Sequence, residues 1–356
     1  MIDATVHIAA ASDAARLAGT TDGGYVHVNC PRCGADDAAL RYRLNVSSIV
    51  TCRICGLSYV DPRVSGPDIE RKLQLWAEQD VVDDERLRTA FEPGALEYHA
   101  RFLAWLSRHA RLPGRRLLDI GCSTGAFLKV ARDAGWQTQG LEIGIASARY
   151  AREILGLEVS RGSIYDFEAP AGSYDAMAMI EVIEHLEQPR LALSQAHRLL
   201  KPDGLLLVTT PNFDSLYRRL FGNRWWVINC EDEHIVLYTL DTLAAMLEEC
   251  GFEVVHRHVR GIDSLGMARE MRDRFLGGAK NPSHPGAAVG GYYESRAAKT
   301  RIKNALRKMG ILNATRWLLR GLDTTYSWRG SPTFAWGEQL VTIARRPRTQ
   351  ARLAGY

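Results

Sequence analysis

The stretch Leu117-Leu118-Asp119-Ile120-Gly121-Cys122-Ser123-Thr124-Gly125 is the most informative part of this chain. It is a short apolar strand that ends in a tight turn with two glycines, and we expect a helix to follow over 126–134. Gly121 lets a ligand approach the backbone, and Gly125 allows a sharp entry into the helix. The Gly-x-x-x-Gly spacing differs from Gly-x-Gly-x-x-Gly, which disfavours a pyrophosphate cofactor. The turn therefore predicts a cofactor site at the end of a strand.

Short apolar strands alternate with amphipathic helices on the C-terminal side of this turn. The expected strands are 116–120, 137–142, 158–161, 174–180, 205–210, 252–258 and 339–345, and the expected helices are 126–134, 145–155, 190–200 and 240–250. This alternation predicts right-handed βαβ units, and hence a doubly wound α/β fold with a mostly parallel sheet. Glu142 ends the second strand, where an acid can accept hydrogen bonds from ribose hydroxyls.

Several motifs together resemble the class I S-adenosylmethionine-dependent methyltransferases, especially the branch around the ubiquinone-biosynthesis O-methyltransferases. They are LLDIGCSTGAFL, GLEIG, SYDAMAMIEVIEHLEQP, LLKPDGLLLVTTPN and HIVLYTLDTLAAMLEECGFEV, within residues 96–258 and 337–346. The resemblance implies a seven-stranded Rossmann-like sheet with a reversed last strand. It also implies in-line displacement at a sulfonium methyl group, for which the protein supplies alignment and exclusion of water. The expected cofactor-binding residues are Asp119, Gly121, Cys122, Gly125, Glu142, Ile143, Ser163, Ile164 and Glu181.

The motif Glu181-Val182-Ile183-Glu184-His185 follows the fourth strand, and strand ends of this kind line the ligand crevice of open α/β sheets. Glu184, His185 and the distant His234 are the candidate catalytic residues, with His185 as a general base. Glu181, Glu184, His185 and His234 could instead hold a divalent ion such as Mg²⁺ that acidifies a substrate hydroxyl. Small-RNA 3′-terminal 2′-O-methyltransferases are similar in this respect. Both interpretations stay open at this point.

Four cysteines form two Cys-x-x-Cys knuckles, Cys30 with Cys33 and Cys52 with Cys55. Four thiolates at this spacing suit tetrahedral Zn²⁺, and a closed site of this type is structural because it has no open coordination position. The intervening segment ALRYRLNVSSIV suits a hairpin. We therefore predict a zinc ribbon, a feature that deoxysugar C-methyltransferases of antibiotic pathways also carry.

The pattern along the chain predicts five parts. They are a flexible tail (1–25), the zinc ribbon (26–64), a helical linker or cap (65–112), the methyltransferase domain (113–260 and 337–348), and a helical insertion that caps the substrate (261–336). Within the insertion, a basic helix at 296–308 is either a solvated surface or a peripheral contact for an anionic partner such as a membrane surface or RNA.

Composition places the chain among ordinary globular proteins. It has 356 residues, a hydrophobic share of 46%, a charged share of 24% and a formal net charge of +4. That weak charge neither requires nor excludes a nucleic-acid partner. Neither a secretory signal nor a stretch long enough to span a membrane is visible, and the spacing of the seven cysteines favours a reducing compartment. We therefore expect a cytoplasmic protein.

Residues 211–238 follow the fifth strand, where the family builds its substrate lid, and Trp225, Trp226 and Tyr238 are the candidate substrate-contacting residues. The expected function is methyl transfer to a small-molecule or glycan-type acceptor. O-methylation is the leading hypothesis, and N- and C-methylation stay open. The alternatives are an RNA methyltransferase, a deoxysugar C-methyltransferase and, least favoured, a non-enzymatic scaffold.

Overall fold

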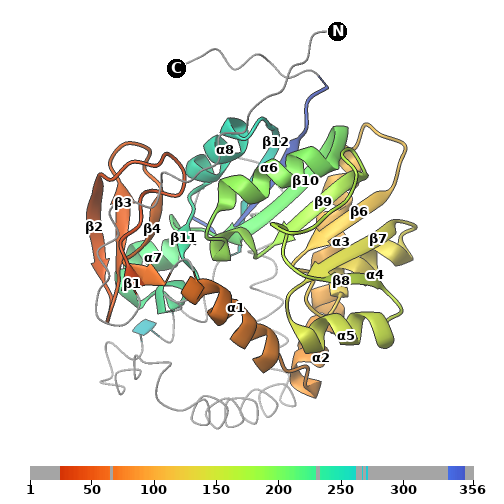
Figure 1. The fold of residues 1–356 in the computed structure, drawn as a ribbon, viewed down its shortest axis with the longest axis horizontal. Helices are drawn as coiled ribbons and strands as arrows, with labels where there is room; N and C mark the ends of the chain where they lie inside the picture. Colours follow the sequence, from red (N-terminus) through yellow and green to blue (C-terminus); the bar gives the residue numbers. More distant parts are fainter. Residues whose placement is uncertain are drawn as a thin grey trace.

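The computed structural model describes residues 25–64, 67–229, 233–261, 267, 270–271 and 336–348. Figure 1 shows a large sheet flanked by helices, with a smaller sheet beside it. Apart from Tyr25, the predicted tail lies outside the described residues. So do nearly all of the predicted insertion and the whole basic helix at 296–308.

The large sheet has seven strands in the order β12-β13-β10-β9-β6-β7-β8. Neighbouring strands from β10 to β8 are parallel, whereas β13 runs antiparallel to both β10 and β12. The predicted seven-stranded doubly wound sheet with a reversed last strand is therefore confirmed. Its strands are β6 (Arg116–Ile120), β7 (Gln137–Glu142), β8 (Glu158–Arg161), β9 (Tyr174–Ile180), β10 (Leu200–Pro211), β12 (Glu253–Arg260) and β13 (Gln339–Arg345).

Helices cover both faces of this sheet and enclose two apolar cores. One core lies between the sheet and α3 (Pro93–His109), α4 (Ala126–Asp133) and α5 (Ile145–Glu153), with Phe102, Phe127 and Ala148 buried in it. The other core lies under α6 (Pro189–Leu199) and α8 (Leu240–Glu249), with Leu193 and Leu247 buried. Because both faces are covered, most residues of the central strands β6, β9 and β10 are buried and apolar.

Two strands differ from their predicted bounds. β12 covers Glu253–Arg260 and not 252–258, because its pairing with β13 continues to Arg260 opposite Gln339. β10 begins at Leu200 and not at Leu205, because Leu200 pairs with Tyr174 before the register shifts. The irregularity falls at Asp203, which has a φ of 65°, a backbone conformation that few non-glycine residues adopt. A local run of apolar residues does not reveal such a bulge.

The cysteine knuckles lie on a second sheet of four strands, in the order β11-β4-β3-β2. β2 (Ala38–Arg43) and β3 (Ser48–Cys52) form the predicted hairpin. β4 (Ser58–Asp61) pairs on its outer edge with β11 (Val236–Leu237), which comes from the distant 211–238 segment. β5 (Arg63–Val64) closes this region against β1 (Tyr25–Val26). We call residues 25–64 the cysteine ribbon, and its Leu57 and Tyr59 are buried in the same core as α6 and α8.

Three helices connect the cysteine ribbon to the large sheet. α1 (Pro67–Gln79) and α2 (Asp84–Phe91) precede α3, and α1 contacts α5 (Figure 1). After β9 and β10 the chain forms the short helices η1 (Ile183–His185), α7 (Leu216–Phe221), η2 (Gly222–Arg224) and η3 (Trp226–Asn229). Within the described residues, no helix combines the length and the apolar character that crossing a bilayer requires.

Candidate active site

The glycine turn Gly121–Gly125 joins β6 to α4 at the point where the strand order reverses. Gly121 and Gly125 have φ values of 71° and 84°, so both occupy the left-handed region that favours glycine. A Cβ on Gly121 would lie 2.6 Å from Val182, and one on Gly125 would lie 2.6 Å from Leu157. Val182 and Leu157 therefore leave no room for a side chain at Gly121 and Gly125, which explains the glycine at each position. Cys122 is buried inside the turn.

Glu142 lies at the end of β7, where the sequence predicts a ribose contact. Its Oε2 accepts a 2.6 Å hydrogen bond from the Ser123 amide, and its Oε1 accepts one of 2.7 Å from the Gly144 amide. Burial raises the pKa of Glu142, and the two amides oppose that shift. Each carboxylate oxygen has two acceptor positions, so Glu142 can still accept hydrogen bonds from ribose hydroxyls.

The other predicted cofactor residues differ in how far they are buried. Asp119 and Ile164 are buried, whereas Ile143 and Ser163 are half-buried. One carboxylate oxygen of Asp119 has no hydrogen-bond partner in the described part of the chain, and burial raises its pKa. A buried acceptor of this kind suits a donor on the cofactor.

A contact that the sequence does not predict joins the α1–α2 connection to the glycine turn. Asp80 accepts hydrogen bonds from the amide and the hydroxyl of Ser147, at 2.6 and 3.0 Å. Arg86 pairs with Asp80 and donates a 3.0 Å hydrogen bond to the Ser123 hydroxyl. Although burial opposes it, these bonds lower the pKa of Asp80. Asp80 and Arg86 come from a segment with no strand–turn–helix signature, so their position depends on tertiary packing.

Glu181 directly follows β9, has a φ of 56° and is half-buried. Its Oε1 accepts hydrogen bonds from the Thr209 hydroxyl at 2.8 Å and from the Gln339 amide at 2.7 Å. Gln339 also donates to the hydroxyl of Tyr98 at 2.5 Å. Burial raises the pKa of Glu181, and the two donors oppose that shift. Sequence patterns do not point to Gln339, Thr209 or Tyr98, because these residues lie on three separate elements.

Glu184, His185 and His234 meet at the end of β9, where each offers one ligand atom within 4.8 Å of the others. Glu181 is not part of this group in the described residues, so the predicted four-residue set is reduced to three. Glu184 is buried, and neither of its carboxylate oxygens has a hydrogen-bond partner in the described chain. Burial, followed by the charge of Glu181, raises the pKa of Glu184.

The two imidazoles are held in one orientation by the main chain. His185 Nδ1 lies 2.7 Å from the carbonyl of Glu233, and His234 Nδ1 lies 3.1 Å from the carbonyl of Val227. A carbonyl can only accept, so each Nδ1 carries the proton and each Nε2 keeps its lone pair. Burial, followed by the neighbouring His234, lowers the pKa of His185 to about 4. Both rings are therefore neutral near pH 7, as a base or a metal ligand requires.

The three aromatic candidates occupy different environments. Trp225 and Tyr238 are completely buried, and Trp225 Nε1 donates a 3.0 Å hydrogen bond to Glu338. Trp226 is 50% exposed, and its ring meets that of His234 edge-on at 6.1 Å between centroids. Of the three, Trp226 alone presents a large exposed surface beside the histidines.

The cysteine ribbon brings its four cysteines together. The Sγ atoms of Cys30 and Cys55 are 3.4 Å apart, those of Cys33 and Cys52 are 3.6 Å apart, and all four lie within 4.8 Å of one another. A tetrahedral Zn²⁺ with Zn–S distances of about 2.3 Å requires sulfur separations of about 3.8 Å. The donor set therefore fits Zn²⁺ with small adjustments.

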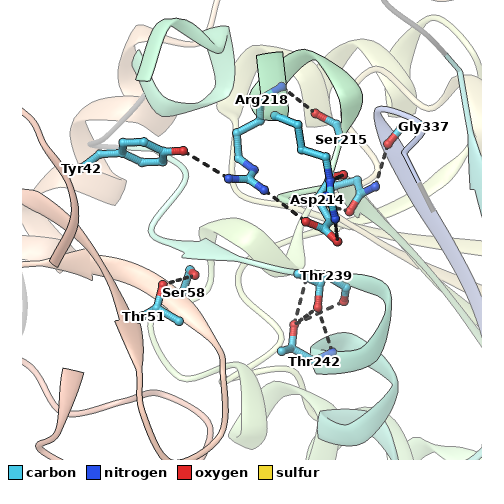
Figure 2. Close-up of polar contacts among 11 residues, drawn as sticks. Tyr42, Thr51, Ser58, Asp214, Ser215, Arg218, Thr239, Thr242 and Gly337 are labelled. Carbon is cyan, nitrogen blue, oxygen red and sulfur yellow. Dashed lines mark hydrogen bonds and ion pairs between the residues drawn. The ribbon is translucent and has the colours of Figure 1, made fainter. Parts of the chain in front are cut away.

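Polar contacts also attach the cysteine ribbon to the 211–238 segment. Figure 2 shows Arg218 of α7 between the two parts, where it donates hydrogen bonds of 3.1 Å to the Tyr42 hydroxyl and of 3.1 Å to Asp214. On the opposite side of the ribbon, Arg32 pairs with Glu249 of α8 at 2.6 Å. The cysteine ribbon is therefore joined to the elements around the histidines on two sides.

Comparisons with known proteins agree with this geometry. Residues 91–257 match the family described as a methyltransferase domain. The ubiquinone biosynthesis O-methyltransferase of Burkholderia pseudomallei is 31% identical over 123 residues, which cover 31% of this chain and 50% of that protein. The protein of the same name from Nitrosococcus oceani is 31% identical over 116 residues, covering 31% and 49%. The chain thus spans about half the length of the curated relatives that it matches.

Two solved structures are also similar to this chain. A SAM-dependent methyltransferase from Archaeoglobus fulgidus is 17% identical with a TM-score of 0.45, covering 74% of this chain and 100% of that one. Phosphoethanolamine N-methyltransferase 2 of Haemonchus contortus, in complex with S-adenosyl-L-methionine, is 16% identical with a TM-score of 0.45, covering 76% and 61%.

Proposed function

We propose that this chain, which belongs to the class I S-adenosylmethionine-dependent methyltransferases, transfers a methyl group to an oxygen atom of a small-molecule or glycan-type acceptor. The match to a methyltransferase domain over residues 91–257 supports the reaction class. The names of the curated relatives favour oxygen as the acceptor atom. The cofactor would lie against the glycine turn, with its ribose hydroxyls donating to Glu142.

The pair of neutral imidazoles is the observation that supports O-methylation most strongly. A hydroxyl is a weak nucleophile until its proton is removed during the reaction, whereas a neutral amine attacks through its own lone pair without a base in that step. His185 Nε2 keeps a lone pair because Nδ1 is bound to the Glu233 carbonyl. We assign His185 as the base that accepts the hydroxyl proton, with His234 beside it at 4.9 Å between ring centroids. Trp226 would face the acceptor.

A divalent cation is a second candidate for the same residues. The carboxylate of Glu184 favours it, because neither oxygen has a hydrogen-bond partner in the described chain and Oε1 lies 3.9 Å from His185 Nε2. Glu184, His185 and His234 would be its protein ligands. When bound, such an ion acts as a Lewis acid that lowers the pKa of a substrate hydroxyl. One carboxylate with two imidazoles suits Mn²⁺, Fe²⁺ or Zn²⁺ better than Mg²⁺, which prefers oxygen ligands.

We also propose a structural Zn²⁺ bound by Cys30, Cys33, Cys52 and Cys55. Its effect would be to fix the two knuckles, and therefore the strands that follow them. A closed four-cysteine site does not activate a substrate. Its contribution to methyl transfer would be limited to holding the cysteine ribbon against the 211–238 segment.

The decisive experiment is a transfer assay with radiolabelled S-adenosylmethionine and a panel of hydroxylated small molecules and glycans, with and without Mn²⁺. We expect a product whose new methyl carbon has the NMR shift of a methoxy group. His185→Gln should lower kcat by about 100-fold, the typical contribution of a general base, and leave cofactor affinity unchanged. A product methylated on nitrogen or carbon would refute O-methylation, and full activity of His185→Gln would refute the assigned base.

A further inference from the structure

Arg63 is a buried cation with almost no hydrogen bonds. It lies on β5, is 5% exposed, and pairs through its backbone with Val26 of β1. A guanidinium group has five N–H donors. In the described chain Arg63 uses one of them, in a 3.3 Å hydrogen bond from Nη2 to the carbonyl of Glu187, whereas Nε and Nη1 have no partner.

Another buried arginine shows how unusual this is. Arg218 is buried to a similar degree, but it pairs with Asp214 and donates to Tyr42. A buried charge without a partner costs several kcal/mol, so proteins normally pair such groups. The charges of the Glu187 and Asp61 carboxylates favour the charged form of Arg63, but burial outweighs them and lowers its pKa. The two oxygens of Asp61 accept from His27 Nδ1 at 3.0 Å and from the Val28 amide at 2.8 Å.

The position of Arg63 connects it to the candidate active site. Glu187, whose carbonyl accepts from Arg63, is two residues after His185, so their Cα atoms are within about 7 Å of each other. The next residue, Gln188, donates its amide to the hydroxyl of Tyr165 at 3.1 Å. Tyr165 directly follows Ser163 and Ile164, two of the residues predicted to bind the cofactor. Arg63 therefore lies against the turn that joins the histidine group to the predicted cofactor-binding residues.

We propose that Arg63 binds an anionic group, a carboxylate or a phosphate, carried by the methyl acceptor. An oxyanion would accept hydrogen bonds from the unpaired N–H donors and neutralise the buried charge. Hydrogen bonds between arginine and an oxyanion are the strongest that arginine makes. The inference rests on the proposed function, because the ligand is assigned as the acceptor. It adds that the acceptor is an acid or a phosphate ester and not a neutral alcohol.

The proposal predicts the sign of a stability change. If Arg63 is a ligand-binding residue, its buried charge destabilises the protein when no ligand is bound. Arg63→Met should then raise the melting temperature by about 2–4 °C. If Arg63 instead supports the fold, the same substitution should lower it. Arg218→Met is the matched control. It removes an arginine that is buried to a similar degree but is ion-paired with Asp214 and hydrogen-bonded to Tyr42, and it should lower the melting temperature.

Binding is tested with inorganic phosphate and with acetate as probes, each titrated at constant ionic strength against chloride. We expect phosphate, acetate or both to raise the melting temperature of the wild type and to have no such effect on Arg63→Met. The more effective anion distinguishes a phosphate from a carboxylate. The proposal is overturned if neither anion stabilises the wild type more than chloride, or if Arg63→Met keeps the full effect.

S-adenosylhomocysteine binding is measured by calorimetry on the same samples. It should be equal in the wild type and in Arg63→Met, because Arg63 is assigned to the acceptor. If anions stabilise the protein through Arg63 but S-adenosylhomocysteine does not bind, the anion site is supported and the proposed methyl transfer is refuted. If S-adenosylhomocysteine binds but anions have no effect through Arg63, the anion site alone is refuted.

Discussion

Tyr59 of the cysteine ribbon and Val236 of the 211–238 segment are paired neighbours in one antiparallel sheet. Beside this pair, the Val60 amide donates to the carbonyl of Ile235, and the Ile235 amide donates to the carbonyl of Glu184. His234 directly precedes Ile235 in the chain. A continuous line of backbone hydrogen bonds therefore runs from the cysteine ribbon to the histidine group, so the ribbon positions two of the three residues in that group.

This relationship predicts that damage to the cysteine ribbon impairs the active site and spares the cofactor site. Cys52→Ser removes a buried ligand of the proposed Zn²⁺ and should release β3 and β4. We expect zinc content to fall from one ion per chain and methyl transfer to fall by about 10-fold or more, the scale seen when a supporting group of a site is lost. Metal analysis and the transfer assay provide the measurements.

Cys250→Ser is the control for this substitution. Cys250 is half-buried after α8 and does not belong to the four-cysteine group, so zinc content and activity should stay at wild-type values. Equal S-adenosylhomocysteine affinity in wild type and Cys52→Ser would support the division of roles. Normal zinc content in Cys52→Ser would contradict the proposed ligand set.

Glu142→Ala should weaken S-adenosylmethionine binding by about 10- to 100-fold, which corresponds to the loss of one or two charge-assisted hydrogen bonds. The reason is that Glu142 is positioned by the Ser123 and Gly144 amides to accept from the ribose. Titration calorimetry with S-adenosylmethionine and S-adenosylhomocysteine measures the effect. Glu158→Ala, at an exposed position on the edge strand β8, should bind both ligands normally. Unchanged affinity in Glu142→Ala would place the cofactor elsewhere.

Most of the large sheet is predictable from sequence because local patterns determine it. β6, β7, β8, β9 and β13 have the predicted bounds, since turn residues and helices alternate with them along the chain. The addition of β11 to the cysteine ribbon is not predictable in this way. The strand β11 has only two residues, Val236 and Leu237. Its partner strand β4 lies more than a hundred residues earlier in the chain.

Gly125→Ala should destabilise the protein more than Gly156→Ala. Both glycines have positive φ values, 84° and 63°, so alanine costs roughly 1 kcal/mol of backbone strain at either position. A Cβ at Gly125 also meets Leu157 at 2.6 Å and Ala151 at 3.2 Å, whereas nothing lies within 4 Å of one at Gly156. We expect total losses of about 2–3 and about 1 kcal/mol, measured by urea unfolding. Equal losses would show that packing behind the glycine turn is unimportant.

Stability should fall in mild acid because of His99, which packs between Tyr98 and Phe127. Burial lowers the pKa of His99 to about 4, whereas an unfolded histidine has a pKa near 6.5. Below pH 6.5 the unfolded chain takes up a proton that the folded chain does not. The contribution of His99 is therefore fully present above pH 6.5 and is lost as the pH falls towards 4, with a ceiling on the order of 3 kcal/mol.

His99→Phe isolates this contribution because it keeps an aromatic ring without a titrating group. The stability difference between the variant and the wild type should grow in favour of the variant from pH 7 to pH 4.5. Unfolding in urea at a series of pH values gives both curves. Parallel curves would mean that His99 is not protonated differently in the two states.

The candidate site is less predictable than the fold for a physical reason. Glu184 and His185 lie in a recognisable motif, but the role of each carboxylate depends on distant partners. Glu181 points to Gln339 and Thr209 because β13 and β10 place donors beside it, so it does not join the histidines. Trp225 is likewise directed into the core by its hydrogen bond to Glu338. The spacing of residues in the sequence predicts which residues follow a strand. Tertiary contacts determine the direction in which their side chains point.

Glu184→Gln should separate stability from function at the histidine group. Glu184 is fully buried without a hydrogen-bond partner in the described chain, and burial raises its pKa. Folding at neutral pH therefore carries the cost of a buried charge or of proton uptake, and a neutral amide of the same shape removes that cost. We expect the free energy of unfolding to rise by about 1–3 kcal/mol at neutral pH. If Glu184 is also a metal ligand, Mn²⁺ should stabilise the wild type and leave the variant unaffected, because a carbonyl binds the ion more weakly than a carboxylate. Thermal melts with and without Mn²⁺ test both points: a destabilised variant would show that the carboxylate supports the fold, and equal Mn²⁺ effects would remove Glu184 from the proposed ligand set.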